Sequence, residues 1–234
     1  MRLLLISNST NAGEAYLEHP LDQIKTFLGS TRVNALFVPY AGVTISFDDY
    51  TSRVSERFQE IGHAITSVHE VDDPVLAVQQ AEAIVVGGGN TFHLAKIMQE
   101  QGLIDAIREK VLAGTPYIGW SAGSNMACPS IRTTNDMPIV EPVSFQALNL
   151  VPFQINPHYL DANPEGHAGE TREMRIEEFL EANPGIFVVG LREGTMFLVE
   201  KELMQLLGPR PARIFKKDYN PQEFEPGADF SFLQ

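Results

Sequence analysis

The stretch TPYIGWSAGSN, residues 115–125, decides the fold that we predict for this chain. Its apolar residues 116–118 are typical of a buried strand, and the residues after Gly123 fit the start of a helix. Glycines two positions before and two positions after Ser121 permit a sharp backbone turn between these elements. A serine on such a strand–turn–helix unit matches a nucleophile elbow, which exposes its hydroxyl at the strand end. In the alternative interpretation, Ser121 only caps the helix.

Short apolar runs alternate with amphipathic segments on both sides of this stretch. The runs that predict strands are residues 2–6, 33–38, 64–68 and 83–86, and those that predict helices are 50–61, 73–81, 94–98 and 103–112. This alternation favours an α/β fold with a mainly parallel sheet and helices on both faces. Ligands of such sheets bind beyond the carboxyl ends of the strands, so we expect the chemistry there.

The pattern changes after residue 150. A helix is predicted over residues 170–182, followed by strand-like runs at 186–189, 196–200 and 213–216 with turns between them. These spacings favour an antiparallel or mixed C-terminal part. Because no linker interrupts the chain, we expect a single domain over residues 1–234.

Composition argues against several classes of partner. The 30 acidic and 17 basic residues give a net charge of -13, which disfavours nucleic acid and anionic membranes. The first apolar run is too short for a signal peptide or a membrane span. The single cysteine, Cys128, rules out an internal disulfide and suits a reducing compartment. We therefore expect a cytoplasmic protein with no membrane partner.

A serine nucleophile needs a base within hydrogen-bond reach. His158 follows the apolar run Gln154–Pro157, where the proline ends the strand and presents the next residue at the sheet rim. His167 lies in the loop sequence PEGHAG and is the second candidate.

The base in turn needs a carboxylate to orient it. Glu193 follows a predicted strand, whereas Asp136 lies in the turn sequence TTNDMP, where such side chains usually cap backbone amides. Each could also be an ordinary loop residue, and the pattern leaves both candidates open.

The glycine run of VGGGNT, residues 86–91, ends one strand and opens a helix. It lacks the lysine of a phosphate-binding loop, so nucleotide binding is disfavoured. The N–H groups of Gly89 and Ala122 could instead form an oxyanion hole. The alternative is a glycine turn needed only for packing.

Six stretches carry a resemblance to a known family: residues 4–10, 86–92, 117–123, 131–140, 153–159 and 166–175. Together they resemble the peptidase E family of bacterial aspartyl dipeptidases. The resemblance implies a fold like that of class I glutamine amidotransferases. It also implies a serine peptidase that hydrolyses Asp-X dipeptides with a free amino terminus through an acyl-enzyme, without a metal or another cofactor.

The same resemblance implies roles for individual residues. Ser121 would be the nucleophile, His158 the base and Glu193 the acid of a catalytic triad, with Asp136 as a rival or supporting acid. Arg172 would receive the side-chain carboxylate of the substrate, as a guanidinium can through two parallel hydrogen bonds.

One residue departs from the family pattern. Arg192 stands before Glu193 where the family usually has proline, and its charge could hold the neighbouring carboxylate ionised or draw it away from His158.

Rival functions remain open at this point. One is a cyanophycinase-like hydrolase of aspartyl peptides, and another is a non-catalytic binding protein on the same scaffold. An amidotransferase-like ammonia producer is disfavoured, because no acid lies two residues after His158. The expected partner is a small Asp-X peptide, and the expected state is a monomer or a weak homodimer.

Overall fold

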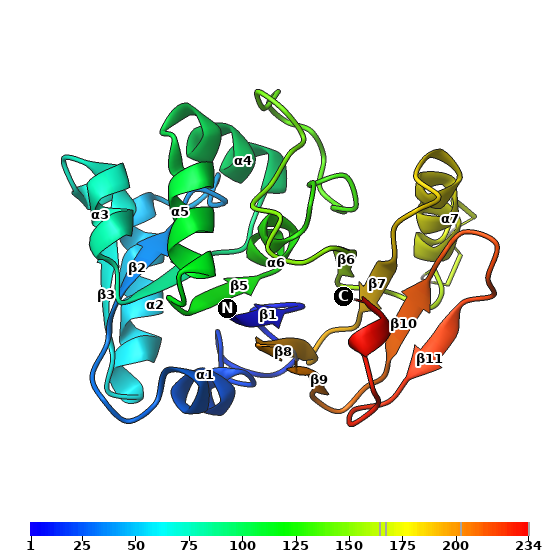
Figure 1. Cartoon of the computed structure of the whole chain (residues 1–234), viewed down its shortest axis with the longest axis horizontal. Helices are drawn as coiled ribbons and strands as arrows, with labels where there is room; N and C mark the ends of the chain where they lie inside the picture. Colours follow the sequence, from blue (N-terminus) through cyan, green and yellow to red (C-terminus); the bar gives the residue numbers. More distant parts are fainter. Residues whose placement is uncertain (164, 167, 202, 234) are drawn as a thin grey trace.

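The computed structural model describes residues 1–163, 165–166, 168–201 and 203–233, and the following elements belong to these residues (Figure 1). The helices are α1 (Leu21–Leu28), α2 (Phe47–Glu60), α3 (Pro74–Gln80), α4 (Thr91–Glu100), α5 (Leu103–Leu112), α6 (Ala122–Ala127) and α7 (Arg172–Ala182), with 3-10 turns η1 (Val68–Glu70) and η2 (Ser231–Leu233). The strands are β1 (Arg2–Ile6), β2 (Asn34–Val38), β3 (Ala64–Ser67), β4 (Ala83–Val86), β5 (Tyr117–Trp120), β6 (Gln154–Pro157), β7 (Val188–Leu191), β8 (Met196–Glu200), β9 (Leu203–Leu207), β10 (Ala212–Phe215) and β11 (Gln222–Phe224).

The larger sheet has the strand order β3-β2-β4-β5-β1-β8-β9. Strands β3, β2, β4, β5 and β1 run parallel, whereas β8 and β9 pair antiparallel at one edge. The predicted α/β fold with a mainly parallel sheet is confirmed. Its parallel strands end at one edge, so the turns that follow β1, β4 and β5 lie close together.

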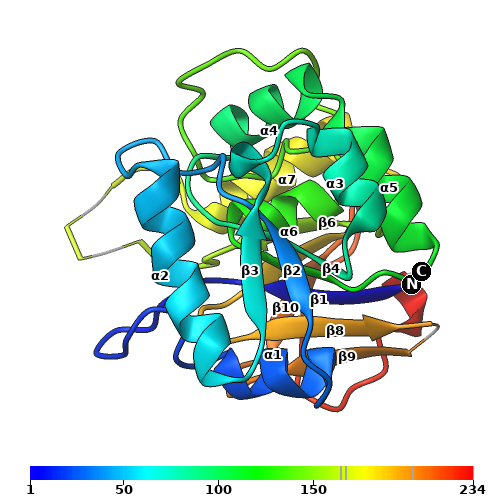
Figure 2. The same cartoon turned by 90° about the vertical axis from the view of Figure 1, so that its left-hand side faces the viewer.

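Helices cover both faces of this sheet, as predicted. Because side chains alternate along a strand, β1 directs Leu4 and Ile6 to one face and Leu3 and Leu5 to the other. The first pair packs with buried residues of α1 and α2, and the second pair belongs to the core cluster that includes α3, α4, α5 and α6. Figure 2 shows α2 on one side of β2 and β3, and α3 and α5 on the other.

A smaller sheet of order β11-β10-β7-β6 carries the C-terminal part. It is mixed, as predicted, because β6 and β7 are parallel while β10 pairs antiparallel with both neighbours. One face packs against α7 through Ile176 and Leu180, and the other contributes Val189 and Leu191 to the core shared with the larger sheet. The predicted strand 196–200 is β8, and it joins the larger sheet.

Capping side chains explain where the helix boundaries differ from the predicted ones. Helix α2 begins at Phe47 because the Ser46 hydroxyl accepts a hydrogen bond from the Asp49 N–H at 3.0 Å. Helix α7 begins at Arg172 because Thr171 caps it through the Met174 N–H at 3.2 Å. Of the helices that the described residues form, none is long and apolar enough to cross a membrane.

Candidate active site

Ser121 occupies a strained turn between β5 and α6. Its φ of 52° and ψ of -111° lie outside the regions that non-glycine residues normally adopt. The Ser121 N–H donates to the Ile6 carbonyl at 3.0 Å, which ties the turn to β1. A Cβ on Gly123 would lie 2.2 Å from the Val86 carbonyl oxygen, and one on Gly119 would lie 2.5 Å from the Gly123 oxygen. Only glycine fits at these two positions, as the sequence pattern predicts for an elbow.

His158 follows β6 and faces Ser121. Its Nε2 lies 3.0 Å from the Ser121 Oγ. The His158 main chain has a φ of 51°, and its N–H donates to the Ser7 hydroxyl at 2.9 Å. That hydroxyl donates in turn to the Leu191 carbonyl at 2.7 Å. Ser7, a buried residue after β1, therefore fixes the backbone that carries the imidazole.

Glu193 follows β7 and meets the other side of the same ring. Its Oε1 lies 2.8 Å from His158 Nδ1. The Glu193 turn is fixed by the Asn8 side chain, whose Oδ1 accepts a hydrogen bond from the Gly194 N–H at 2.8 Å. Serine, imidazole and carboxylate thus form one hydrogen-bonded chain, the arrangement that activates a hydroxyl for nucleophilic attack.

Asp136 serves a different contact. Its Oδ2 accepts hydrogen bonds from the Thr91 N–H at 2.7 Å, the Thr91 hydroxyl at 2.6 Å and the Thr134 hydroxyl at 3.0 Å. These bonds place it at the first residue of α4. Of the two candidate acids, the structure brings Glu193 to the His158 ring, and in the described residues Asp136 makes no hydrogen bond to that ring.

The glycine run after β4 approaches the elbow closely. A Cβ on Gly88 would lie 2.9 Å from the Trp120 ring and 3.1 Å from the Ser121 Cβ. Gly89 has a φ of +137°, and a Cβ there would meet the Ala41 carbonyl oxygen at 2.2 Å. In the part of the chain that the structure describes, the Gly89 and Ala122 N–H groups donate no hydrogen bond. Both are thus free to bind a substrate oxygen, and the Gly88 N–H, which the sequence did not single out, is equally free.

Ser121 and His158 open into a cavity of about 750 Å³, and Gly89 and Asp136 also line it. Arg172 lines a second, smaller cavity of about 160 Å³, and Asp136 borders both. Arg172 and Ser121 therefore line different cavities, and Asp136 is shared by the two linings. Burial and the neighbouring Arg175 lower the pKa of the Arg172 guanidinium, while Asp136 opposes that change.

Arg192 points away from Glu193. Its guanidinium donates to Asp161 Oδ2 at 3.0 Å and to Glu223 Oε2 at 2.8 Å, and its side chain is 9% exposed. The two carboxylates raise the pKa of Arg192 well above its ordinary value. Asp161 and Glu223 thus neutralise the Arg192 charge. Arg192 therefore does not pull the Glu193 carboxylate away from the His158 imidazole. His167, the second candidate base, lies outside the described residues.

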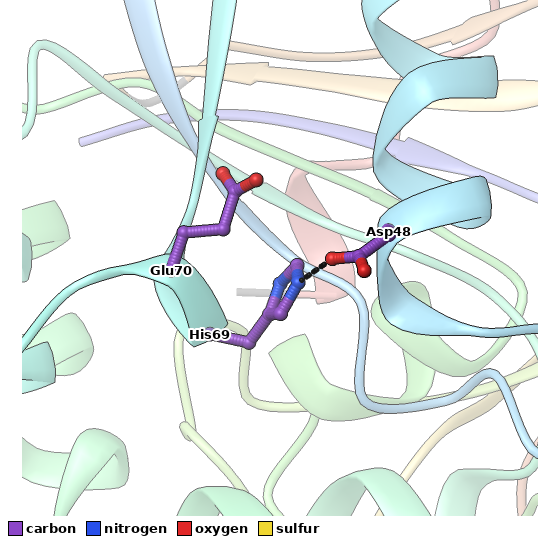
Figure 3. A group of neighbouring side chains, drawn as sticks. All are labelled: Asp48, His69 and Glu70. Carbon is purple, nitrogen blue, oxygen red and sulfur yellow. Dashed lines mark hydrogen bonds and ion pairs between the residues drawn. The ribbon is translucent and has the colours of Figure 1, made fainter.

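One group of side chains could hold a metal ion. The ligand atoms of Asp48, His69 and Glu70 lie within 4.8 Å of one another (Figure 3). Both His69 nitrogens already have partners, since Nε2 lies 2.8 Å from Asp48 Oδ1 and Nδ1 lies 2.5 Å from the Ser67 hydroxyl. The contact between His69 and Asp48 therefore links η1 to α2. None of the three residues is among the described residues that line the Ser121 cavity.

Comparisons with known proteins place the chain among peptidases. The sequence model of peptidase family S51 matches residues 3–207. Peptidase E of Nostoc sp. is 53% identical over 99% of this chain and 96% of its own length. Peptidase E of Escherichia coli O6:K15:H31 is 50% identical over 98% of this chain and 100% of its own.

Two solved structures share the fold. One is named for a peptidase E protein of Listeria monocytogenes EGD-e, with a TM-score of 0.66 and 21% identity over 89% of this chain and 98% of that chain. The other, a peptidase from an acI-B1 actinobacterium, has a TM-score of 0.69 and 15% identity over 97% and 95% of the two chains. Both are consistent with the predicted glutamine amidotransferase-like fold.

Proposed function

The chain belongs to peptidase family S51 as a serine peptidase of the dipeptidase E type, and we propose that it hydrolyses Asp-X dipeptides with a free amino terminus. The observation that carries this proposal is the hydrogen-bonded chain from Ser121 through His158 to Glu193. A nucleophile, a base and an orienting acid in this order are what acyl transfer through a serine requires.

In the proposed reaction, His158 Nε2 takes the Ser121 hydroxyl proton as Oγ attacks the peptide carbonyl carbon. The Gly89 and Ala122 N–H groups would stabilise the oxyanion of the tetrahedral intermediate. His158 then gives its proton to the departing amine, the C–N bond breaks, and the aspartyl group remains on Ser121 as an ester. Water, activated by the same imidazole, hydrolyses this ester.

Glu193 would act throughout as the acid that orients the imidazole. Its hydrogen bond to Nδ1 keeps Nε2 free to accept the serine proton and stabilises the cation that forms. Asp136, whose Oδ2 already accepts three hydrogen bonds, is better suited to hold the substrate.

Selectivity for aspartate would come from Arg172 and Asp136 together. A guanidinium binds a carboxylate through two parallel hydrogen bonds, so Arg172 suits the aspartate side chain. Asp136 borders both cavities and has its Oδ1 free of hydrogen bonds among the described residues, so it suits the substrate α-ammonium. The substrate's N-terminal residue would then cross from the larger cavity into the smaller one.

Purified protein tests this proposal with Asp-p-nitroanilide and Asp-Leu beside the matching Glu, Asn and Ala compounds. We expect turnover of the aspartyl compounds only, and Ser121→Ala should abolish it. Equal turnover of the Asp, Glu, Asn and Ala compounds, or activity that survives Ser121→Ala, would refute the proposal. Cleavage of an aspartyl-arginine polymer instead of Asp-Leu would favour the cyanophycinase-like alternative.

The acid is tested by comparing two variants. Glu193→Ala should lower kcat by about 10³- to 10⁴-fold, because the imidazole loses the partner that sets its tautomer. Asp136→Asn should chiefly raise KM, because Asn keeps the shape of the side chain but does not attract an ammonium group. A Glu193→Ala variant that retains full activity would remove Glu193 from the mechanism.

We also propose that residues 1–234 form one domain that works in the cytoplasm as a monomer or a weak homodimer and binds no nucleic acid. The core cluster that joins residues of both sheets supports the single domain. The net charge of -13 supports the absence of nucleic acid. One cooperative unfolding transition and a sedimentation mass near 25.9 kDa would agree with this proposal.

A further inference from the structure

Arg53 projects from α2 into the cavity that contains Ser121 and His158. Its guanidinium carbon lies 4.1 Å from the centre of the Tyr16 ring, which also lines the cavity. A cation over an aromatic face is attracted by the ring's negative face, so Tyr16 holds Arg53 without neutralising it.

Hydrogen bonds connect the Tyr16 ring, which lies beneath Arg53, to the turn that carries Ser121. The Tyr50 hydroxyl donates to the Gly88 carbonyl at 2.9 Å and accepts a hydrogen bond from Trp120 Nε1 at 3.2 Å. The Tyr16 hydroxyl lies 3.4 Å from that of Tyr50. The ring beneath Arg53 is therefore fixed relative to the residue that precedes Ser121.

Arg53 has no carboxylate partner among the described residues. No ion pair formed by the described residues includes Arg53, although the chain has 30 acidic and only 17 basic residues. It is also the one lysine or arginine among the described residues that line this cavity. An unpaired cation in an acidic protein, facing the nucleophile's cavity, is suited to an anionic part of a ligand.

The helices that carry Arg53 and Arg172 lie on opposite sides of α6. Arg53 belongs to α2 and Arg172 to α7, and Figure 1 shows α6, which follows Ser121, between these two helices. An Asp-X dipeptide carries two carboxylates, one on the aspartate side chain and one at the C-terminus. With the first directed toward Arg172, the second would lie on the side of α2, from which Arg53 reaches the cavity.

We propose that Arg53 binds the C-terminal carboxylate of the leaving residue and so limits the substrate to dipeptides. This inference rests on the proposed function and adds a specificity residue to it. Each further residue in a peptide moves its terminal carboxylate by about 3.3–3.6 Å, which exceeds the tolerance of a hydrogen bond. A longer peptide would bring a neutral amide to Arg53 in place of the carboxylate.

The side chain of the leaving residue would meet an apolar wall. Val43, Ile45 and Ile139 line the same cavity, and Val43 and Ile139 are 50% and 49% exposed. A leaving residue with an apolar side chain would remove this exposed apolar surface from water, which is favourable. We therefore expect a preference for leaving residues such as leucine.

The test compares Asp-Leu with Asp-Leu amide, which lacks only the terminal charge. The measured quantity is the ratio of kcat/KM for the acid to kcat/KM for the amide. Arg53→Gln should lower this ratio by about 10- to 100-fold, the usual effect of losing a charge-assisted hydrogen bond. Arg53→Lys should restore part of it. Arg57→Gln is the matched control, since Arg57 lies one helical turn away, pairs with Glu60 and does not belong to the described cavity lining.

A ratio that Arg53→Gln leaves unchanged would overturn the inference, as would an equal fall in Arg57→Gln. General damage to the fold lowers both rates together and leaves the ratio intact, so it is distinguishable from a lost carboxylate contact. Failure of the proposed function has a separate signature, because Asp-p-nitroanilide and Asp-Leu would then show no Ser121-dependent turnover in the unchanged protein.

Discussion

Single atoms decide the geometry at the elbow. A Cβ at position 123 would press on the main-chain oxygen of Val86 at 2.2 Å, and backbone cannot move aside as a side chain can. We expect Gly123→Ala to lower the free energy of unfolding by about 1–3 kcal/mol, a usual cost of overpacking, and to abolish peptidase activity. Denaturant unfolding measures the first effect. Gly185→Ala, where a Cβ meets nothing within 4 Å, should leave stability almost unchanged.

The Cys128 thiol should be chemically silent in the folded protein. It is fully buried, and burial raises its pKa to about 12. Because only the thiolate reacts with disulfide reagents, we expect no labelling at pH 8 and one labelled thiol per chain in 6 M guanidinium, both measured by absorbance. Fast labelling of the native protein would show that α6 opens readily, contrary to the close packing around it.

Stability at the junction between α2 and β3 should depend on pH. His63 is 3% exposed, and its Nδ1 accepts a hydrogen bond from the Val33 N–H at 3.2 Å. Burial lowers its pKa below the usual 6.5. The unfolded chain then binds the proton more readily, so this stability is complete above about pH 6.5 and is lost as pH falls through the lower folded pKa.

The control for this prediction is His63→Asn, whose side-chain oxygen can still accept from Val33. The melting temperature of the wild-type protein should fall as the pH is lowered from 7.5 to 5, and that of the variant should fall by a smaller amount. Equal slopes for the two proteins would show that other groups set the acid limit.

The elements that position Ser121 could be predicted because their signals are local. The strand, the glycine turn and the helix of residues 115–125 are adjacent in the chain, so pattern alone indicates their geometry. Ser7 and Asn8 gave no such signal. They contact His158 and Gly194 across 151 and 186 residues, and a buried serine or asparagine after a strand looks like any other until the fold brings its partner near.

The sequence also did not show which strands pair with one another. The pattern indicated mixed strands after residue 186, but alternation of apolar residues gives no preference for one sheet over another. The β8–β9 hairpin joins β1, while β7 and β10 form the smaller sheet with β6. Helix α1 was not predicted, since its N-cap residue Pro20 forms no side-chain cap. The distance between Arg172 and the serine's cavity likewise depends on loops that pattern cannot place.

At the scale of the whole molecule, the site lies where the two sheets meet. The larger sheet contributes Ser121 after β5, and the smaller sheet contributes His158 after β6 and Glu193 after β7. The hydrogen bonds that join Ser121, His158 and Glu193 therefore depend on how firmly the smaller sheet is held. Arg192 joins the loop after β6, through Asp161, to strand β11, through Glu223.

Removing that cation should loosen the smaller sheet and affect catalysis indirectly. Arg192→Met leaves two carboxylates without their partner, and we expect a loss of about 1–3 kcal/mol, less than for a fully buried pair because both carboxylates are partly exposed. Arg192 lowers the pKa of Asp161 and Glu223, so its stabilisation is present above their unfolded values and disappears as pH falls through the folded ones. The stability difference between the two proteins, measured by urea unfolding at pH 7 and pH 3, should therefore shrink at the lower pH. A constant difference would mean that Arg192 acts through packing against Tyr159 and not through its charge.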